Sequence, residues 1–210
     1  MNVCPLSIQM RQVSHLQPFY HNAASFASCD PRLDFFQLNV DFSEFSVLIG
    51  KYLGLSDSDL KIHEIGGLFH DIGKIGVPDK ILRKESKLTD DEYSEIKNHP
   101  SIGKHILSNA SLFEDLIPIV YHHHEKYDGT GYPKQLKGEE IPLLARIVGV
   151  ADAFDAMTSR RSYRDELDLE YVKNEISNCS GTQFDPEIAR VFLDILNNEF
   201  DKILQKKNQF

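Results

Sequence analysis

Cysteine is scarce in this sequence, with only three among 210 residues. The three, Cys4, Cys29 and Cys179, are widely spaced and odd in number, and no two of them form a C-x-x-C pair. This pattern argues against a disulfide framework and against a zinc site built from thiolates. It fits a protein of a reducing cytoplasm, and we expect a cytoplasmic location.

Long apolar runs are also missing. No stretch approaches the roughly 18 consecutive apolar residues that a membrane span requires. Residues 1–18 contain no apolar run of signal-peptide length. We therefore expect a soluble chain without a membrane span.

Positive charge is in deficit, with 23 basic against 32 acidic side chains and a formal net charge of -9. A long anionic polymer would be repelled by such a surface, so nucleic acid is not an expected partner. A small phosphate ester is not excluded, because the charge of a bound metal ion dominates its own site.

The length and the hydrophobic share of 41% are ordinary for one globular domain. Residues 1–31 mix polar, aromatic and small side chains without a clear period, which indicates an irregular leader. We therefore divide the chain into a leader, 1–31, and one domain, 32–210.

Helical periodicity dominates the rest of the chain. Apolar residues recur at steps of three and four over 33–53, 56–69 and 141–157. Gly54 is expected to end the first of these helices and Gly73 to help close the second. Period-two alternation is almost absent, so the sequence predicts an all-α fold.

Further helix starts are marked by capping residues. Two capping boxes place a glutamate three positions after a hydroxyl residue, Thr89 with Glu92 and Ser111 with Glu114. They predict helices that end near residues 99 and 124. Asp185 is expected to cap a last helix, with Pro186 in its first turn.

Imidazoles and carboxylates lie at or near the expected helix ends or inside an apolar helix. They are His70, Asp71, His99, His122, His123, His124 and Asp152. A single histidine of this kind is more often structural than a ligand. Several of them on different helices, with carboxylates and without cysteine, are the ligands expected for catalytic iron, manganese or zinc. An aspartate can bridge two such ions.

The order of these residues resembles a known family. The motifs are His70-Asp71-Ile72-Gly73-Lys74, His99-Pro100-x-x-Gly103, His123-His124-Glu125, Asp128-Gly129-x-Gly131-Tyr132-Pro133 and Asp152-x-x-Asp155-Ala156-x-Thr158-Ser159. Together they resemble the HD-GYP subfamily of the HD superfamily of metal-dependent phosphohydrolases, over roughly residues 33–196. The resemblance implies a single HD-superfamily helical bundle of the HD-GYP type.

The resemblance also implies an activity, the hydrolysis of cyclic di-GMP to linear pGpG or to GMP by a hydroxide that bridges two divalent ions, iron or manganese. Position by position, one ion would be held by His70, Asp71 and Asp152, and its neighbour by His99, His123 and His124. Asp71 would bridge the two ions. Lys74 resembles the lysine that meets the scissile phosphate, so Asp71 and Lys74 are the expected catalytic residues.

Three further residues are expected at the substrate beside Lys74. Arg161 and Arg164 stand where the family has cationic residues, although a solvated helix end explains them equally well. Tyr132 lies in a glycine-rich turn that could be a simple turn, but its closeness to the histidine pair favours contact with substrate or with a partner. By analogy with the family, diguanylate cyclase (GGDEF) domains or a sensor protein would act in trans.

The sequence departs from the family pattern in its first expected helix. Leu38 stands where active members usually carry a ligand histidine, and Asp34 stands at a glutamate that allows a third ion. Leucine cannot bind a metal, whereas Asp34 could still supply a carboxylate. Two alternatives therefore stay open: a degenerate module that binds nucleotide or a signalling partner without hydrolysis, and a phosphodiesterase for another cyclic dinucleotide such as cyclic GMP-AMP.

Overall fold

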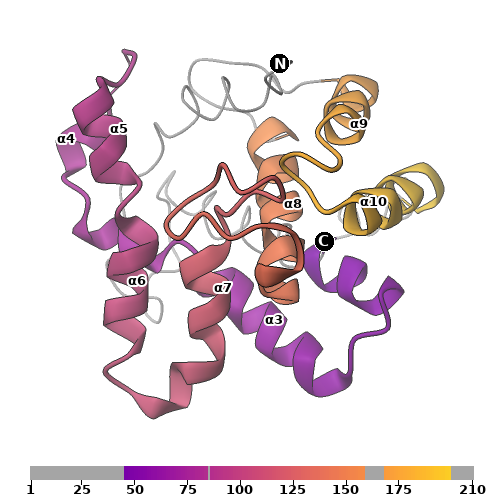
Figure 1. The fold of residues 1–210 in the computed structure, drawn as a ribbon, viewed down its shortest axis with the longest axis horizontal. Coiled ribbons are helices and arrows are strands. Elements are labelled where there is room, and N and C mark those ends of the chain that lie inside the picture. Colours follow the sequence, from indigo (N-terminus) through magenta and orange to yellow (C-terminus); the bar gives the residue numbers. More distant parts are fainter. Residues whose placement is uncertain (1–44, 85, 159–167, 200–210) are drawn as a thin grey trace, which may run out of the picture.

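The computed structural model describes residues 45–84, 86–158 and 168–199. Within these ranges every regular element is a helix, apart from one isolated β-bridge between Ser180 and Phe184. The predicted all-α fold is confirmed (Figure 1).

A helix over residues 45–52 precedes the labelled elements. The α-helices that follow are α3 (Asp57–Phe69), α4 (Asp79–Leu82), α5 (Asp90–Ile96), α6 (His99–Leu107), α7 (Ile117–His122), α8 (Leu143–Thr158), α9 (Leu169–Asn178) and α10 (Pro186–Asn198). Short 3₁₀ helices connect some of them, namely η2 (Ile72–Gly76), η3 (Ser111–Leu116) and η4 (Gly138–Glu140).

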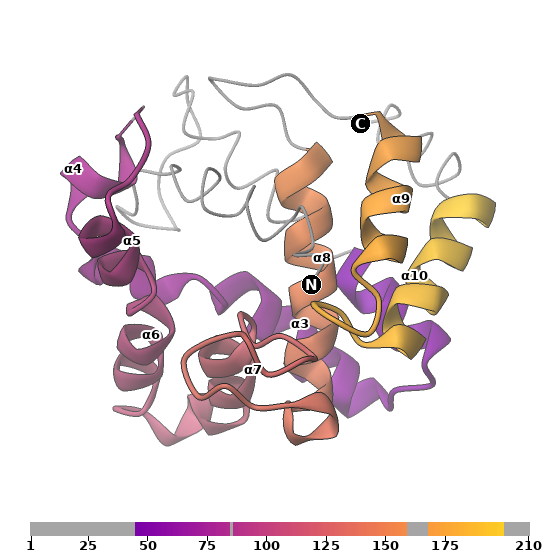
Figure 2. The same ribbon diagram turned by 45° about the horizontal axis from the view of Figure 1, so that its top comes forward.

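Helix α8 lies at the centre of the molecule, with α9 and α10 on one side and α6 and α7 on the other (Figures 1 and 2). One face of α8 joins the largest buried cluster, where Phe154 meets Phe45 and Phe192 edge-on at 5.0 and 5.1 Å between ring centroids. A second face packs Val148 against Ile119 of α7. Because α8 is buried on both faces, a polar residue within it has a fixed position.

Several predicted helix boundaries are confirmed. Gly54 follows the helix over 45–52 with a φ of 76°, a conformation that favours glycine. Ser56 caps α3 by accepting a hydrogen bond from the Asp59 amide. The Thr89 capping box opens α5, and the Asp185 side chain accepts two amide hydrogen bonds at the start of α10.

Other boundary predictions are wrong. Ser111 makes no capping hydrogen bond and begins the 3₁₀ helix η3, so α7 starts five residues later than the second capping box indicated. Gly73 lies inside η2 and does not close α3. Helices α6 and α9 were not predicted as separate elements.

Cys179 takes part in a disulfide, which the cysteine spacing did not indicate.

Part of the prediction falls on residues that the structure does not describe. These are the leader 1–31, most of the first expected helix with Asp34 and Leu38, and the two arginines, Arg161 and Arg164. Among the helices that are described, none is both long enough and apolar enough to cross a membrane.

His63, a residue without motif support, is buried on α3. Its Nε2 atom lies 2.5 Å from the Ser46 hydroxyl, and its Nδ1 atom has no hydrogen-bond partner. Burial disfavours the imidazolium and lowers the pKa of His63 from 6.5 to about 4, although the bond to Ser46 partly opposes this shift.

This burial predicts an acid-sensitive fold. On unfolding, His63 regains its ordinary pKa, so the unfolded chain binds more protons than the native chain between pH 6.5 and about 4. The free energy of unfolding should therefore fall as the pH is lowered through this window, by up to about 3 kcal/mol from this residue. Urea unfolding between about pH 7 and about pH 4.5 should show a smaller fall in His63→Gln than in the wild type. An identical pH dependence in both proteins would contradict this assignment.

Candidate metal centre

Three histidines of the predicted site stand at the ends of helices. His70 caps the C-terminus of α3 and His123 caps the C-terminus of α7. His99 follows the last residue of α5 by three positions and begins α6. All three side chains are buried. The helix ends therefore bring three imidazoles into the interior from three directions.

Each of these rings is fixed by the same hydrogen bond. Nδ1 lies 2.5 Å from the Gly67 carbonyl oxygen in His70, 2.8 Å from that of Ile96 in His99, and 2.9 Å from that of Val120 in His123. Each carbonyl belongs to the last turn of a helix, where carbonyls have no intrahelical partner. Since a carbonyl can only accept, Nδ1 carries the proton and donates it. In a neutral ring Nε2 then carries the lone pair that can bind a cation.

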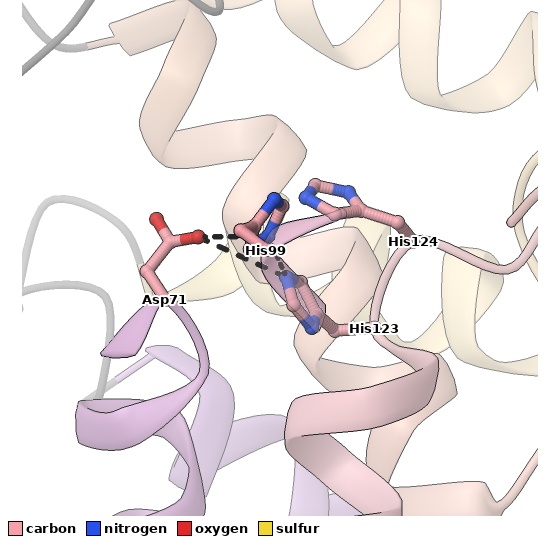
Figure 3. Close-up of side chains that lie close together, drawn as sticks. All are labelled: Asp71, His99, His123 and His124. Carbon is pink, nitrogen blue, oxygen red and sulfur yellow. Dashed lines mark hydrogen bonds and ion pairs between the residues drawn. The ribbon is translucent and has the colours of Figure 1, made fainter. Parts of the chain in front are cut away.

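The carboxylate of Asp71 lies between these Nε2 atoms. Its Oδ2 atom lies 3.3 Å from His70 Nε2 and forms an ion pair with Lys74. Its Oδ1 atom lies 3.2 Å from His99 Nε2 and 3.9 Å from His123 Nε2 (Figure 3). One oxygen of this carboxylate therefore faces His70, and the other faces His99 and His123.

The group around Oδ1 fits a metal ion. One ligand atom from each of Asp71, His99, His123 and His124 lies within 4.8 Å of the others. Asp71 Oδ1 is buried and accepts no hydrogen bond, and the Nε2 atoms of His99 and His123 lie only 3.3 Å apart. With the proton of each ring on Nδ1, neither Nε2 can donate to the other. Lone pairs that converge in this way would be stabilised by a cation, and imidazole with carboxylate suits a divalent transition metal.

The group around Oδ2 holds fewer ligands among the described residues. His70 Nε2 lies 3.8 Å from Asp152 Oδ1, and Asp152 lies in the central helix α8. Burial alone would lower the pKa of His70, but Asp71 and Asp152 reverse this effect and raise it to about 9. The carboxylates that stabilise a proton on this ring would also stabilise a divalent cation at its Nε2.

Burial and charge also shift the pKa values of His123, His124 and Asp71. Burial, followed by the neighbouring histidines, lowers the pKa values of His123 and His124 well below their ordinary value. Burial would raise the pKa of Asp71, but Lys74 and His70 outweigh it and hold this pKa well below its usual range. An ionised Asp71 carboxylate thus lies beside the His123 and His124 rings, whose neutral forms burial favours, and metal ligation requires these protonation states.

Gly73 allows the backbone of η2 to approach α6. A Cβ atom at this position would lie 1.8 Å from the His99 carbonyl oxygen and 2.5 Å from the Gly103 nitrogen. No side chain fits in that space, so only glycine permits the contact. Asp71 and His99 flank this contact, which explains how two different segments hold ligand atoms 3.2 Å apart.

The glycine-rich turn lies beside the cluster. The Tyr132 amide donates to the His124 carbonyl at 3.2 Å, and the two rings are tilted by 31° with their centroids 4.9 Å apart. Burial, followed by the charges of Tyr93, Asp152 and Asp71, raises the pKa of Tyr132 well above its ordinary value. The tyrosine is therefore placed at the edge of the metal centre.

The structure thus brings together most of the predicted site residues: His70, Asp71, Lys74, His99, His123, His124, Tyr132 and Asp152. Asp34, Arg161 and Arg164 lie outside the described residues. His122 lies next to the buried Glu125, 3.5 Å from its carboxylate. Glu125 belongs to the His123-His124-Glu125 motif, but no role was predicted for it from the sequence.

A profile of the HD domain family matches residues 13–188. A cyclic di-GMP phosphodiesterase of Thermotoga maritima is 40% identical over 163 residues, which are 77% of this chain and 44% of that protein. The 3'3'-cGAMP-specific phosphodiesterase 2 of Vibrio cholerae is 36% identical over 143 residues, 67% of this chain and 27% of that protein. The chain spans less than half the length of either enzyme.

A solved structure supports the fold. An HDG"Y"P protein from Bdellovibrio bacteriovorus superposes with a TM-score of 0.63 and 22% identity, over 77% of this chain and 52% of that one. At this identity the similarity concerns the fold, and it agrees with the helical bundle described above.

The contact at Gly73 predicts a local and severe effect of a methyl group. Gly73→Ala should lower the free energy of unfolding by about 3 kcal/mol or more, because backbone atoms of α6 must move. Gly76→Ala in the same 3₁₀ helix is the matched control and should cost less, since its Cβ would meet the Ile102 side chain, at 2.9 Å from Cδ1 and 3.0 Å from Cγ2, and not backbone atoms. Denaturant unfolding and metal titration of both variants measure the difference. Equal stability of the two variants would contradict the proposed role of the η2–α6 contact.

Proposed function

Because the chain belongs to the HD domain family, we propose that it is a metal-dependent phosphodiesterase that hydrolyses cyclic di-GMP to linear pGpG, to GMP, or to both. The observation that carries this proposal is the convergence of the His99 and His123 Nε2 atoms on one buried carboxylate oxygen, Asp71 Oδ1. The Thermotoga maritima relative, a cyclic di-GMP phosphodiesterase, supports the choice of substrate.

The proposed centre holds two divalent ions, iron or manganese. His70, Asp71 and Asp152 would hold one ion, and Asp71, His99, His123 and His124 would hold the other. The different surroundings of the two Asp71 oxygens support this division. A third ion is not part of the proposal. Asp34 remains a candidate ligand for the less complete group around His70, where Leu38 supplies none.

The protein's own residues would act on the phosphodiester in distinct ways. When bound, the ions would supply Lewis acidity and bring the pKa of water near neutrality. Lys74, held beside Asp71 by an ion pair, would offset negative charge that develops on the phosphate. Tyr132 would contact the substrate at the edge of the site, with Arg161 and Arg164 as further phosphate-binding candidates.

A cyclic GMP-AMP substrate is the second candidate, and the Vibrio cholerae relative specific for 3'3'-cGAMP favours it. The predicted ligands would meet phosphate and not base edges, so they do not discriminate between these dinucleotides. A binding module without hydrolysis is the third candidate, motivated by Leu38. Against it stand the many buried ionisable groups, which would be costly without a bound cation.

We also propose that partners act in trans, either GGDEF domains or a sensor protein, and that the Tyr132 turn contributes to the contact. The turn is partly exposed between α7 and α8, where another protein could reach it. A pull-down with a GGDEF domain that is unchanged when residues 131–133 are replaced would contradict this proposal.

The activity depends on Asp71 in this account. Asp71→Asn should lower kcat/KM for cyclic di-GMP by at least about 100-fold, because the amide cannot bridge two cations as a carboxylate does. Asp79→Asn, an exposed aspartate paired with Arg83, is the control and should keep wild-type turnover. The assay follows pGpG and GMP by chromatography after anaerobic purification with iron or manganese.

The same assay separates the candidates. Faster turnover of cyclic GMP-AMP than of cyclic di-GMP would identify cyclic GMP-AMP as the preferred substrate, which is the second candidate. Tight nucleotide binding by a metal-loaded protein that forms no product would support the binding module and overturn the proposed hydrolysis.

A further inference from the structure

Glu125 is a buried carboxylate that the proposed metal centre does not use. It follows His124 directly, and its side chain is fully buried. Its Oε1 atom accepts the Lys134 amide at 2.7 Å, and its Oε2 atom accepts the Leu136 amide at 3.2 Å. Both oxygens therefore bind the backbone of one loop, residues 126–137, and Glu125 is not part of the cluster of possible metal ligands.

The loop held in this way carries Tyr132 to the metal centre. The bonds to Glu125 fix residues 134 and 136, just beyond the tyrosine. At its beginning the loop is tied to the α9–α10 connection, where the Asp128 amide donates to the Thr182 carbonyl at 2.8 Å. Tyr132 lies between these two anchors, with its amide on the His124 carbonyl and its ring against the His124 ring.

We infer that Glu125 is a positioning residue, which holds loop 126–137 so that Tyr132 stays against His124 and faces the substrate of the proposed phosphodiesterase. The contact of Tyr132 with a substrate rests on the proposed function. The role of Glu125 in holding the loop does not depend on activity. The clamp consists of two hydrogen bonds, from the Lys134 and Leu136 amides to the Glu125 carboxylate.

The role requires a carboxylate in particular. The Lys134 and Leu136 amides are both donors, and a carboxylate offers an acceptor to each. Glutamine has nearly the same shape, but its NH₂ group would face one of the two amides and lose that hydrogen bond. Alanine would leave both amides without the side-chain acceptor. The order of effects should therefore be wild type, Glu125→Gln, Glu125→Ala.

The test combines turnover with hydrogen exchange on the metal-loaded chain. Glu125→Gln should lower kcat/KM for the cyclic dinucleotide by about 10- to 100-fold while the metal content stays at the wild-type value. Amide exchange in residues 126–137 should become faster, with no change in α6. Glu140→Gln is the matched control, because Glu140 also accepts a loop amide, that of Lys137 at 3.0 Å, but at an exposed position.

A double-mutant cycle with Tyr132→Ala identifies the route of the effect. If Glu125 acts through Tyr132, Glu125→Gln should cause little further loss of turnover in the Tyr132→Ala background. Additive losses, or equal losses in Glu125→Gln and Glu140→Gln, would overturn the inference. Loss of metal from Glu125→Gln would also overturn it, since the residue would then support the ligands and not the loop.

Failure of the proposed function gives a different result. If the wild type hydrolyses no cyclic dinucleotide, the proposed phosphodiesterase activity is wrong. Faster amide exchange in residues 126–137 of Glu125→Gln would still support the clamp. If amide exchange in residues 126–137 of Glu125→Gln equals that of the wild type, Glu125 does not hold the loop, whatever the activity.

Discussion

The hydrogen bond from a histidine Nδ1 to the carbonyl three residues earlier is the interaction on which the site depends. It occurs at His70, His99 and His123, and each time it satisfies a carbonyl that the end of a helix leaves unpaired. The same bond sets the tautomer and the direction of the ring, so Nε2 faces inward as an acceptor. The hydrogen bond that ends each helix thus also orients the imidazole ring. Moving a helix end by one residue would turn that ring away from Asp71.

The rest of the fold holds these helix ends together. The central helix α8 is buried on two faces and carries Asp152 to the group around His70. The glycine contact between η2 and α6 brings Asp71 to His99, and Glu125 accepts hydrogen bonds from the loop that follows His123 and His124. With such rigid supports, the side chains of the candidate centre are ordered when the chain folds. The entropy lost by ordering them is therefore not a cost of binding a ligand.

The sequence predicted the helical class and the membership of the cluster because both depend on local patterns and ordered motifs. Caps such as Ser56 and Asp185 were readable since the acceptor and its donors lie within three residues. The start of α7 was not, because Ser111 has the composition of a cap but enters a 3₁₀ turn. The bonds of Glu125 and the close approach at Gly73 could not be predicted, since their partners are backbone atoms placed by tertiary packing.

The most direct test of this account is the protonation pattern of the three helix-end histidines. Nitrogen NMR of the imidazoles in the zinc-loaded protein, which is diamagnetic, distinguishes a protonated Nδ1 from a protonated Nε2 at each ring. The account predicts a proton on Nδ1 and a metal-shifted Nε2 for His70, His99 and His123. A proton on Nε2 of His99 or His123 in the metal-loaded protein would contradict it, because the carbonyl bonds would then not direct the ligands.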